Sequence, residues 1–165
     1  MNHSKLLVTA TFLVLSACGT ETAGPDEATT EDLTARALQL AQDNLIVDTH
    51  VDVPYRIDRR PADIAQATES GDFDYPRAVA GGLNAPFMSI YTPAELESEG
   101  KSKELAESLI TLVEGFVEAA PEKFAIARSV ADVREQFEAG LISLPMGMEN
   151  GSPVEGDLDN LKYFH

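Results

Sequence analysis

Residues 45–54 read LIVDTHVDVP, a short apolar run that gives way to polar positions. An apolar, β-branched run of this length is typical of a buried strand, and we expect it to emerge at its polar end. His50 and Asp52 are two residues apart, so both side chains should lie on one face of the strand. An imidazole and a carboxylate can bind one zinc ion, although a His-x-Asp pair alone is more often a plain hydrogen-bonded pair. The segment therefore predicts a strand with two candidate metal ligands at its end.

Two further strands are expected over residues 85–91 (APFMSIY) and 141–148, the latter interrupted by Pro145, which cannot donate to a ladder. Apolar residues at helical spacing predict helices over residues 31–44, 102–120 and 129–139 and from Leu158 onward. Residues 56–80 are polar and indicate a long loop with about one helical turn. Strands that alternate with helices in this order are typical of a parallel sheet with crossover helices.

Glu149 follows the third predicted strand, within the sequence GMENG of residues 147–151. A carboxylate at this position can bridge two metal ions, with one oxygen on each ion. Acidic residues at strand ends more commonly cap loops or helices, so Glu149 alone is a weak signal. It gains weight from His50 and Asp52, because functional side chains gather at the carboxyl ends of parallel strands.

Three segments together resemble the membrane dipeptidase family, the renal dipeptidase-type zinc metallopeptidases. Residues 46–54 are similar to the opening motif D-x-H-x-D-x-P, Gly81-Gly82 precedes a similar second strand, and residues 141–151 resemble the third strand. The resemblance covers about residues 33–165 and implies an α/β fold, the first three or so β/α units of a metal-dependent-hydrolase-type TIM (β/α)₈ barrel. A whole barrel needs at least about 200 residues. The chain has 165 residues, so we expect a truncated, N-terminal piece of the barrel over residues 31–165.

By this resemblance, His50 and Asp52 bind a first zinc ion and Glu149 bridges two, with two Zn²⁺ ions expected in the intact protein. The implied reaction is the metal-assisted hydrolysis of dipeptides. The family's second zinc takes two more histidines from later strands, and a later aspartate handles the proton of the attacking water. His3 and His165 are the other histidines here, and neither is expected to be a ligand. We therefore assign no catalytic residue and expect the fragment to be inactive.

Two positions depart from the family pattern: Asn150 stands where the commonest form has Gly, and Ser152 where many members have His. These departures affect the expected substrate preference more than the metal ligands. An alternative interpretation is a non-catalytic lipoprotein whose barrel binds peptides without cleaving them. A third is another metal barrel, such as a phosphoesterase or deaminase, but those usually open with His-x-His rather than His-x-Asp.

The N-terminus resembles that of an exported bacterial lipoprotein. Residues 6–15 form an apolar run of ten residues, too short for a bilayer span of about 20 but typical of a signal peptide. Leu15-Ser16-Ala17-Cys18 resembles the lipobox, which predicts a signal peptide over residues 1–17 and lipidation of Cys18. Residues 18–30 are expected to be a disordered tether. The predicted product is an exported, membrane-anchored lipoprotein. If the source is Gram-negative, the location is periplasmic or at the outer membrane, and Gly19 favours the outer membrane.

The net charge of −16 argues against nucleic acid as a partner, because phosphate binding needs clustered Lys and Arg. The single cysteine rules out a disulfide framework within the chain. The expected partners are therefore a dipeptide substrate and, through the lipid anchor, a membrane. A homodimer is left open.

Overall fold

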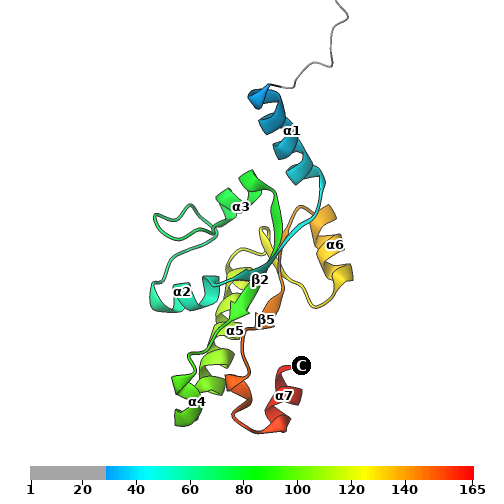
Figure 1. Cartoon of the computed structure of the whole chain (residues 1–165). Helices are drawn as coiled ribbons and strands as arrows, with labels where there is room; N and C mark the ends of the chain where they lie inside the picture. Colours follow the sequence, from blue (N-terminus) through cyan, green and yellow to red (C-terminus); the bar gives the residue numbers. More distant parts are fainter. Residues whose placement is uncertain (1–28) are drawn as a thin grey trace, which may run out of the picture.

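The computed structural model describes residues 29–165 and has an α/β architecture built on parallel strands (Figure 1). The larger sheet has the strand order β1-β2-β5, with β1 at Ile46–Val51, β2 at Leu83–Ile90 and β5 at Met146–Met148. A second sheet pairs β3 (Phe124–Ile126) with β4 (Ile142–Leu144). All strand pairs among the described residues are parallel, which confirms the predicted parallel α/β class.

The helices flank these strands, and the long ones follow the predicted boundaries closely. They are α1 (Thr30–Asp43), α2 (Val53–Arg59), α3 (Tyr75–Gly81), α4 (Glu95–Glu99), α5 (Ser102–Ala119), α6 (Val130–Glu138) and α7 (Leu158–Phe164), with a 3₁₀ turn η1 at Ser152–Val154. Thr29 caps α1 and shares a capping box with Asp32, so the last two residues of the expected tether belong to this helix. No helix within residues 29–165 is long and apolar enough to cross a membrane.

The prediction of a loop over residues 56–80 was wrong at both ends, where α2 and α3 form. Each helix has seven residues, too few for an apolar stripe to show its period. Their start signals were present nonetheless. Both helices carry a proline in the first turn, and the Asp74 side chain accepts a hydrogen bond from the Arg77 backbone N–H at the start of α3.

The third predicted strand is divided at Pro145 into β4 and β5, which belong to different sheets. Pro145 donates no hydrogen bond, but its carbonyl accepts one from the Met88 N–H at 2.8 Å. The strand β3, which pairs with β4, was not predicted because its three residues follow directly on a helix end and a turn.

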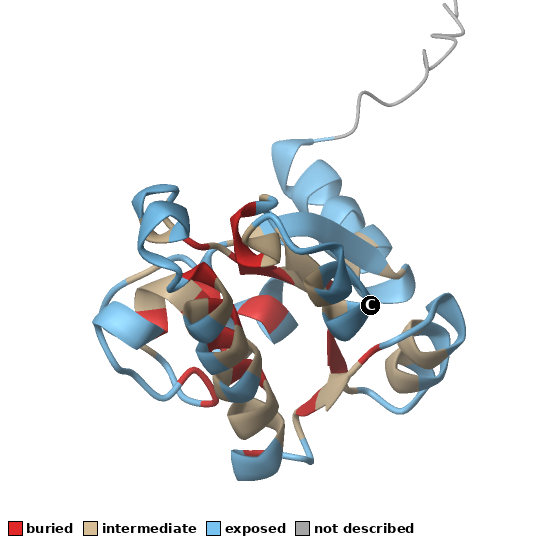
Figure 2. Ribbon diagram, turned by 90° about the horizontal axis from the view of Figure 1, so that it is seen from below, coloured by how far each residue is buried: buried red, intermediate tan, exposed pale blue. Residues whose placement is uncertain are grey.

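The hydrophobic core lies between α5 and the strands. Ala106, Leu109 and Val113 on one face of α5 are fully buried, together with Phe124 and Leu144 on the second sheet. Figure 2 shows the buried segments gathered there, whereas α1 is exposed along its length. The prediction that the first strand is buried was wrong: β1 is exposed except at Val51, which is half-buried.

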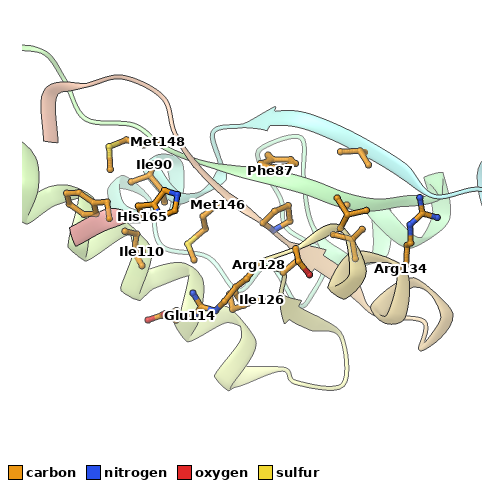
Figure 3. A pocket seen from close by; sticks show the side chains of 18 of the residues that line it. Phe87, Ile90, Ile110, Glu114, Ile126, Arg128, Arg134, Met146, Met148 and His165 are labelled. Atoms are coloured by element: carbon orange, nitrogen blue, oxygen red, sulfur yellow. Dashed lines mark ion pairs between the residues drawn. The ribbon is translucent and has the colours of Figure 1, made fainter. Parts of the chain in front are cut away.

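An apolar cavity of about 1050 Å³ opens between the larger sheet, α5, α6 and α7. Figure 3 shows the side chains that line it, among them Phe87, Ile90 and Met146 from the strands and Ile110 from α5. His165 also lines this cavity. His50, Asp52 and Glu149 do not, so this cavity is separate from the predicted metal ligands.

Candidate metal centre

The structure brings the three predicted metal ligands together at the carboxyl edge of the larger sheet. His50 is the last residue but one of β1, Asp52 follows β1 as the N-cap of α2, and Glu149 follows β5. The His50 Nε2 atom lies 3.2 Å from Asp52 Oδ1 and 3.5 Å from Glu149 Oε2. One ligand atom from each residue lies within 4.8 Å of the other two. Asp52 was predicted to lie on the strand itself; it stands one residue beyond it.

The convergence follows from the strand order. Strands β1 and β5 flank β2 and run parallel to it, so the residues after their carboxyl ends meet at one edge of the sheet. The Glu149 N–H donates to the Ile90 carbonyl at 3.3 Å and continues the pairing of β5 with β2 by one step. Residues 99 positions apart in the chain, His50 and Glu149, therefore become neighbours.

The end of β1 is irregular where His50 stands. The register of β1 against β2 shifts between Asp48 and Val51. The His50 N–H donates to the Asp48 carboxylate at 3.0 Å, a local side-chain-to-backbone bond within this irregular stretch. Irregular strand ends of this kind commonly redirect a side chain beside a functional site. Asp48 therefore helps to set the direction in which the imidazole leaves the strand.

The residues around Glu149 are fixed to the end of β2. The Ser89 hydroxyl donates to Glu149 Oε2 at 3.0 Å, and the Asn150 amide donates to the Thr92 carbonyl at 2.9 Å. Asn150 Oδ1 also accepts from the Ser152 N–H at 3.1 Å. Asn150, which stands where the commonest family form has Gly, thus closes the turn after Glu149. Sequence reasoning missed Ser89 and Thr92, because a lone hydroxyl in an apolar strand carries no motif.

The donor set fits a divalent metal ion. One imidazole nitrogen and two carboxylates are the ligand types that zinc accepts in catalytic sites. The exposed fractions of the three side chains are 49% (His50), 65% (Asp52) and 35% (Glu149). An ion and a small substrate could therefore reach them from solvent. This is the one such ligand group within residues 29–165. His165 lies apart from it, along the apolar cavity.

The family model described as membrane dipeptidase (peptidase family M19) matches residues 34–165. The chain belongs to the membrane dipeptidase family. The resemblance read from the sequence motifs is thereby confirmed, with nearly the same boundaries.

Lipidation of Cys18 and the signal peptide fall outside the residues that the structure describes.

Relatives within the membrane dipeptidase family are similar over most of this chain. A dipeptidase from Aspergillus terreus, ataJ, is 28% identical over 142 residues, which are 79% of this chain and 35% of the relative. The chain therefore spans about a third of the length of that relative.

Solved structures are also similar to this chain. A metallopeptidase from Rhodobacter sphaeroides, liganded with a phosphinate mimic of L-Ala-D-Ala, is 26% identical, with a TM-score of 0.64 over 73% of this chain and 42% of its own. The metallopeptidase named dipeptidase AC is 27% identical, with a TM-score of 0.64 over 73% of this chain and 39% of its own. The probable dipeptidase PvdM from Pseudomonas aeruginosa has a TM-score of 0.73 over 82% of this chain and 36% of its own, and at 21% identity it supports the fold alone.

Proposed function

We propose that the full-length protein is a zinc-dependent dipeptidase with a binuclear metal centre, to which this chain contributes His50, Asp52 and Glu149. The observation that carries the proposal is the meeting of these three side chains, with ligand atoms within 4.8 Å of one another, at the carboxyl edge of a parallel sheet. Family membership supports dipeptide hydrolysis as the class of reaction.

Each ligand has a distinct part in this proposal. His50 and Asp52 come from the two sides of the β1–α2 junction and would hold one ion between them. Glu149 offers two oxygens, of which Oε2 is fixed by Ser89, and it would bridge two ions. When bound, two zinc ions supply a hydroxide nucleophile near neutral pH and polarise the scissile carbonyl. The exposure of the ligands leaves room for the substrate on the solvent side.

The proposed substrates are small dipeptides. Support comes from the relative whose structure holds a mimic of the dipeptide L-Ala-D-Ala. The 165-residue chain by itself should bind a metal ion but cleave no dipeptide, because the described residues gather one histidine and two carboxylates and no further ligand. We also propose that the protein is exported and held at a membrane through lipidated Cys18, on the strength of the lipobox-like sequence before it.

The decisive experiment compares Glu149→Ala with Glu118→Ala, a control at an exposed position of α5. Zinc content by mass spectrometry and dipeptide hydrolysis are measured on the full-length protein. We expect Glu149→Ala to lower bound zinc and to reduce hydrolysis by at least about 10²-fold, because a lost bridging carboxylate disturbs both ions. Glu118→Ala should match the wild type.

Two results would count against the proposal. Unchanged zinc content and hydrolysis in Glu149→Ala would show that the cluster is not the metal centre. Tight binding of the phosphinate dipeptide mimic by a full-length protein that hydrolyses no dipeptide would favour the peptide-binding alternative.

A further inference from the structure

Ser89 is a buried hydroxyl that points at a proposed metal ligand. It lies on β2, the middle strand of the larger sheet, and only 3% of its surface is exposed. Its neighbours Met88 and Ile90 are buried apolar residues. A hydroxyl removed from water in such a buried stretch of strand is unfavourable unless it is hydrogen-bonded. Its hydrogen-bond partner is Glu149 Oε2 at 3.0 Å.

The direction of this hydrogen bond is set by chemistry. An ionised carboxylate only accepts hydrogen bonds, so the Ser89 hydroxyl must donate to Glu149. A bond from a hydroxyl to a charged oxygen is stronger than a bond between neutral groups. Ser89 therefore fixes one oxygen of Glu149 at that position.

The register of the sheet holds Glu149 at a second point. Ser89 pairs with Gly147 across β2 and β5, and Glu149 stands two residues farther along the same side. The Glu149 N–H donates to the carbonyl of Ile90, the residue next to Ser89. Backbone and carboxylate of Glu149 are thus held by consecutive residues of one strand, which leaves the side chain little freedom to swing.

We infer that Ser89 is a positioning residue for the metal centre: it contributes no ligand atom but presets the Glu149 carboxylate for metal binding. The inference rests on the proposed function, in which Glu149 is a ligand. Partners of this kind orient ligands before the ion arrives, and removing one typically lowers metal affinity 10- to 100-fold. Strand β2 thereby takes part in the centre, although all three ligands lie on or directly after its neighbours β1 and β5.

The test measures the zinc affinity of the full-length protein by competition with a chromophoric chelator. We expect Ser89→Ala to bind zinc about 10- to 100-fold more weakly than the wild type. The matched control is Ser143→Ala, which also removes a buried serine hydroxyl and its hydrogen bond, at 2.6 Å to Gln136 Oε1, but lies away from the cluster. It should lower thermal stability without changing zinc affinity.

Two further measurements separate positioning from a structural role. Ser89→Thr keeps the hydroxyl and should restore most of the zinc affinity. If its extra methyl group prevents folding, the comparison of Ser89→Ala with Ser143→Ala still decides the question. The visible spectrum of the Co²⁺-substituted protein should change in Ser89→Ala and not in Ser143→Ala, because only Ser89→Ala removes the hydrogen bond that holds the Glu149 carboxylate.

The inference is overturned if Ser89→Ala binds zinc as tightly as the wild type, or if both serine variants lose affinity equally. A wild-type protein that binds no zinc, or a Glu149→Ala variant that binds it unchanged, would instead overturn the proposed function. Failure of the inference alone is therefore recognisable, because zinc binding would still depend on Glu149 and not on Ser89.

Discussion

Replacement of Asp74 by Asn should destabilise the protein strongly, because Asp74 is the centre of a buried hydrogen-bond cluster. Its side chain is 1% exposed. The carboxylate accepts from the Thr68 N–H at 2.8 Å, from the Arg77 N–H at 3.0 Å, and from Arg77 Nε and Nη2 at 2.9 and 2.7 Å. This cluster ties the loop after α2, the helix whose N-cap is Asp52, to the start of α3.

The expected loss of stability in Asp74→Asn depends on which hydrogen bonds of the carboxylate the amide can still make. The bonds from Thr68 N–H and the Arg77 guanidinium end on Oδ2, and the bond from Arg77 N–H ends on Oδ1. The Asn carbonyl can serve only one of these two oxygens, and the amide at the other cannot accept. The negative charge that pairs with Arg77 is lost in either orientation. Breaking a buried ion pair typically destabilises a protein by about 3–5 kcal/mol. The Arg77 side chain is 46% exposed and can be rehydrated, so we expect the low end, about 3 kcal/mol. In the control Asp132→Asn, a half-buried residue of the first turn of α6, the loss should stay below about 1 kcal/mol.

The assay is urea unfolding of both variants, read as the midpoint and slope of the transition. A second readout is pH. The hydrogen bond from Arg77 holds the pKa of Asp74 well below its ordinary value of 3.8, against the opposing effect of burial. The pKa is lower in the folded state, so this stabilisation is full well above pH 3.8 and is lost as the pH falls toward the folded-state pKa.

Asp74→Asn should therefore show a smaller decline in unfolding free energy than the wild type as the pH falls below 3.8. The reasoning is refuted if Asp74→Asn loses no more stability than Asp132→Asn at neutral pH. An acid decline as steep as that of the wild type would equally contradict it.

Two other outcomes are expected. Gly82→Ala should destabilise by at least about 2 kcal/mol, because Gly82 has φ +76° and an added Cβ would lie 2.6 Å from the Ala41 carbonyl oxygen. Gly100→Ala, at φ +63° with open space around it, should lose only about 1 kcal/mol, and equal losses in urea unfolding would show that the close approach is unimportant. Cys18→Ser should abolish incorporation of labelled palmitate and membrane association, whereas Ser16→Ala keeps a small residue in the lipobox and should retain both; label that persists in Cys18→Ser would contradict lipidation there.

Long periodic segments allowed the sequence to predict α1, α5 and α6 almost to the residue. The sequence did not predict α2, α3 and β3, because each helix spans at most two turns and the strand only three residues. Their local signals were present as prolines and a capping aspartate, but such signals also occur in loops.

The candidate site was predicted because one of three histidines and two acidic residues stand at the ends of apolar runs, in segments that resemble the family motifs. What the sequence could not reveal was how these ligands are held. Ser89 lies on β2 and Thr92 lies two residues after its end, about 60 positions before Glu149 and Asn150, and they contact these residues only because β2 pairs with β5. A hydrogen bond of that kind depends on strand register, which a single sequence does not state.

Pro145 explains how Glu149 reaches this register. An unbroken strand over residues 141–148 would continue along its partner β3, but the described β3 ends at Ile126 and pairs only with β4. Pro145 ends that pairing because it has no N–H, and its carbonyl turns to the Met88 N–H of β2. From there β5 runs beside β2, so that Gly147 faces Ser89 and Glu149 arrives at the Ser89 hydroxyl. Pro145, which seemed to interrupt the predicted strand, is therefore the point at which the backbone hydrogen bonds pass from β3 to β2, the strand that positions the ligand.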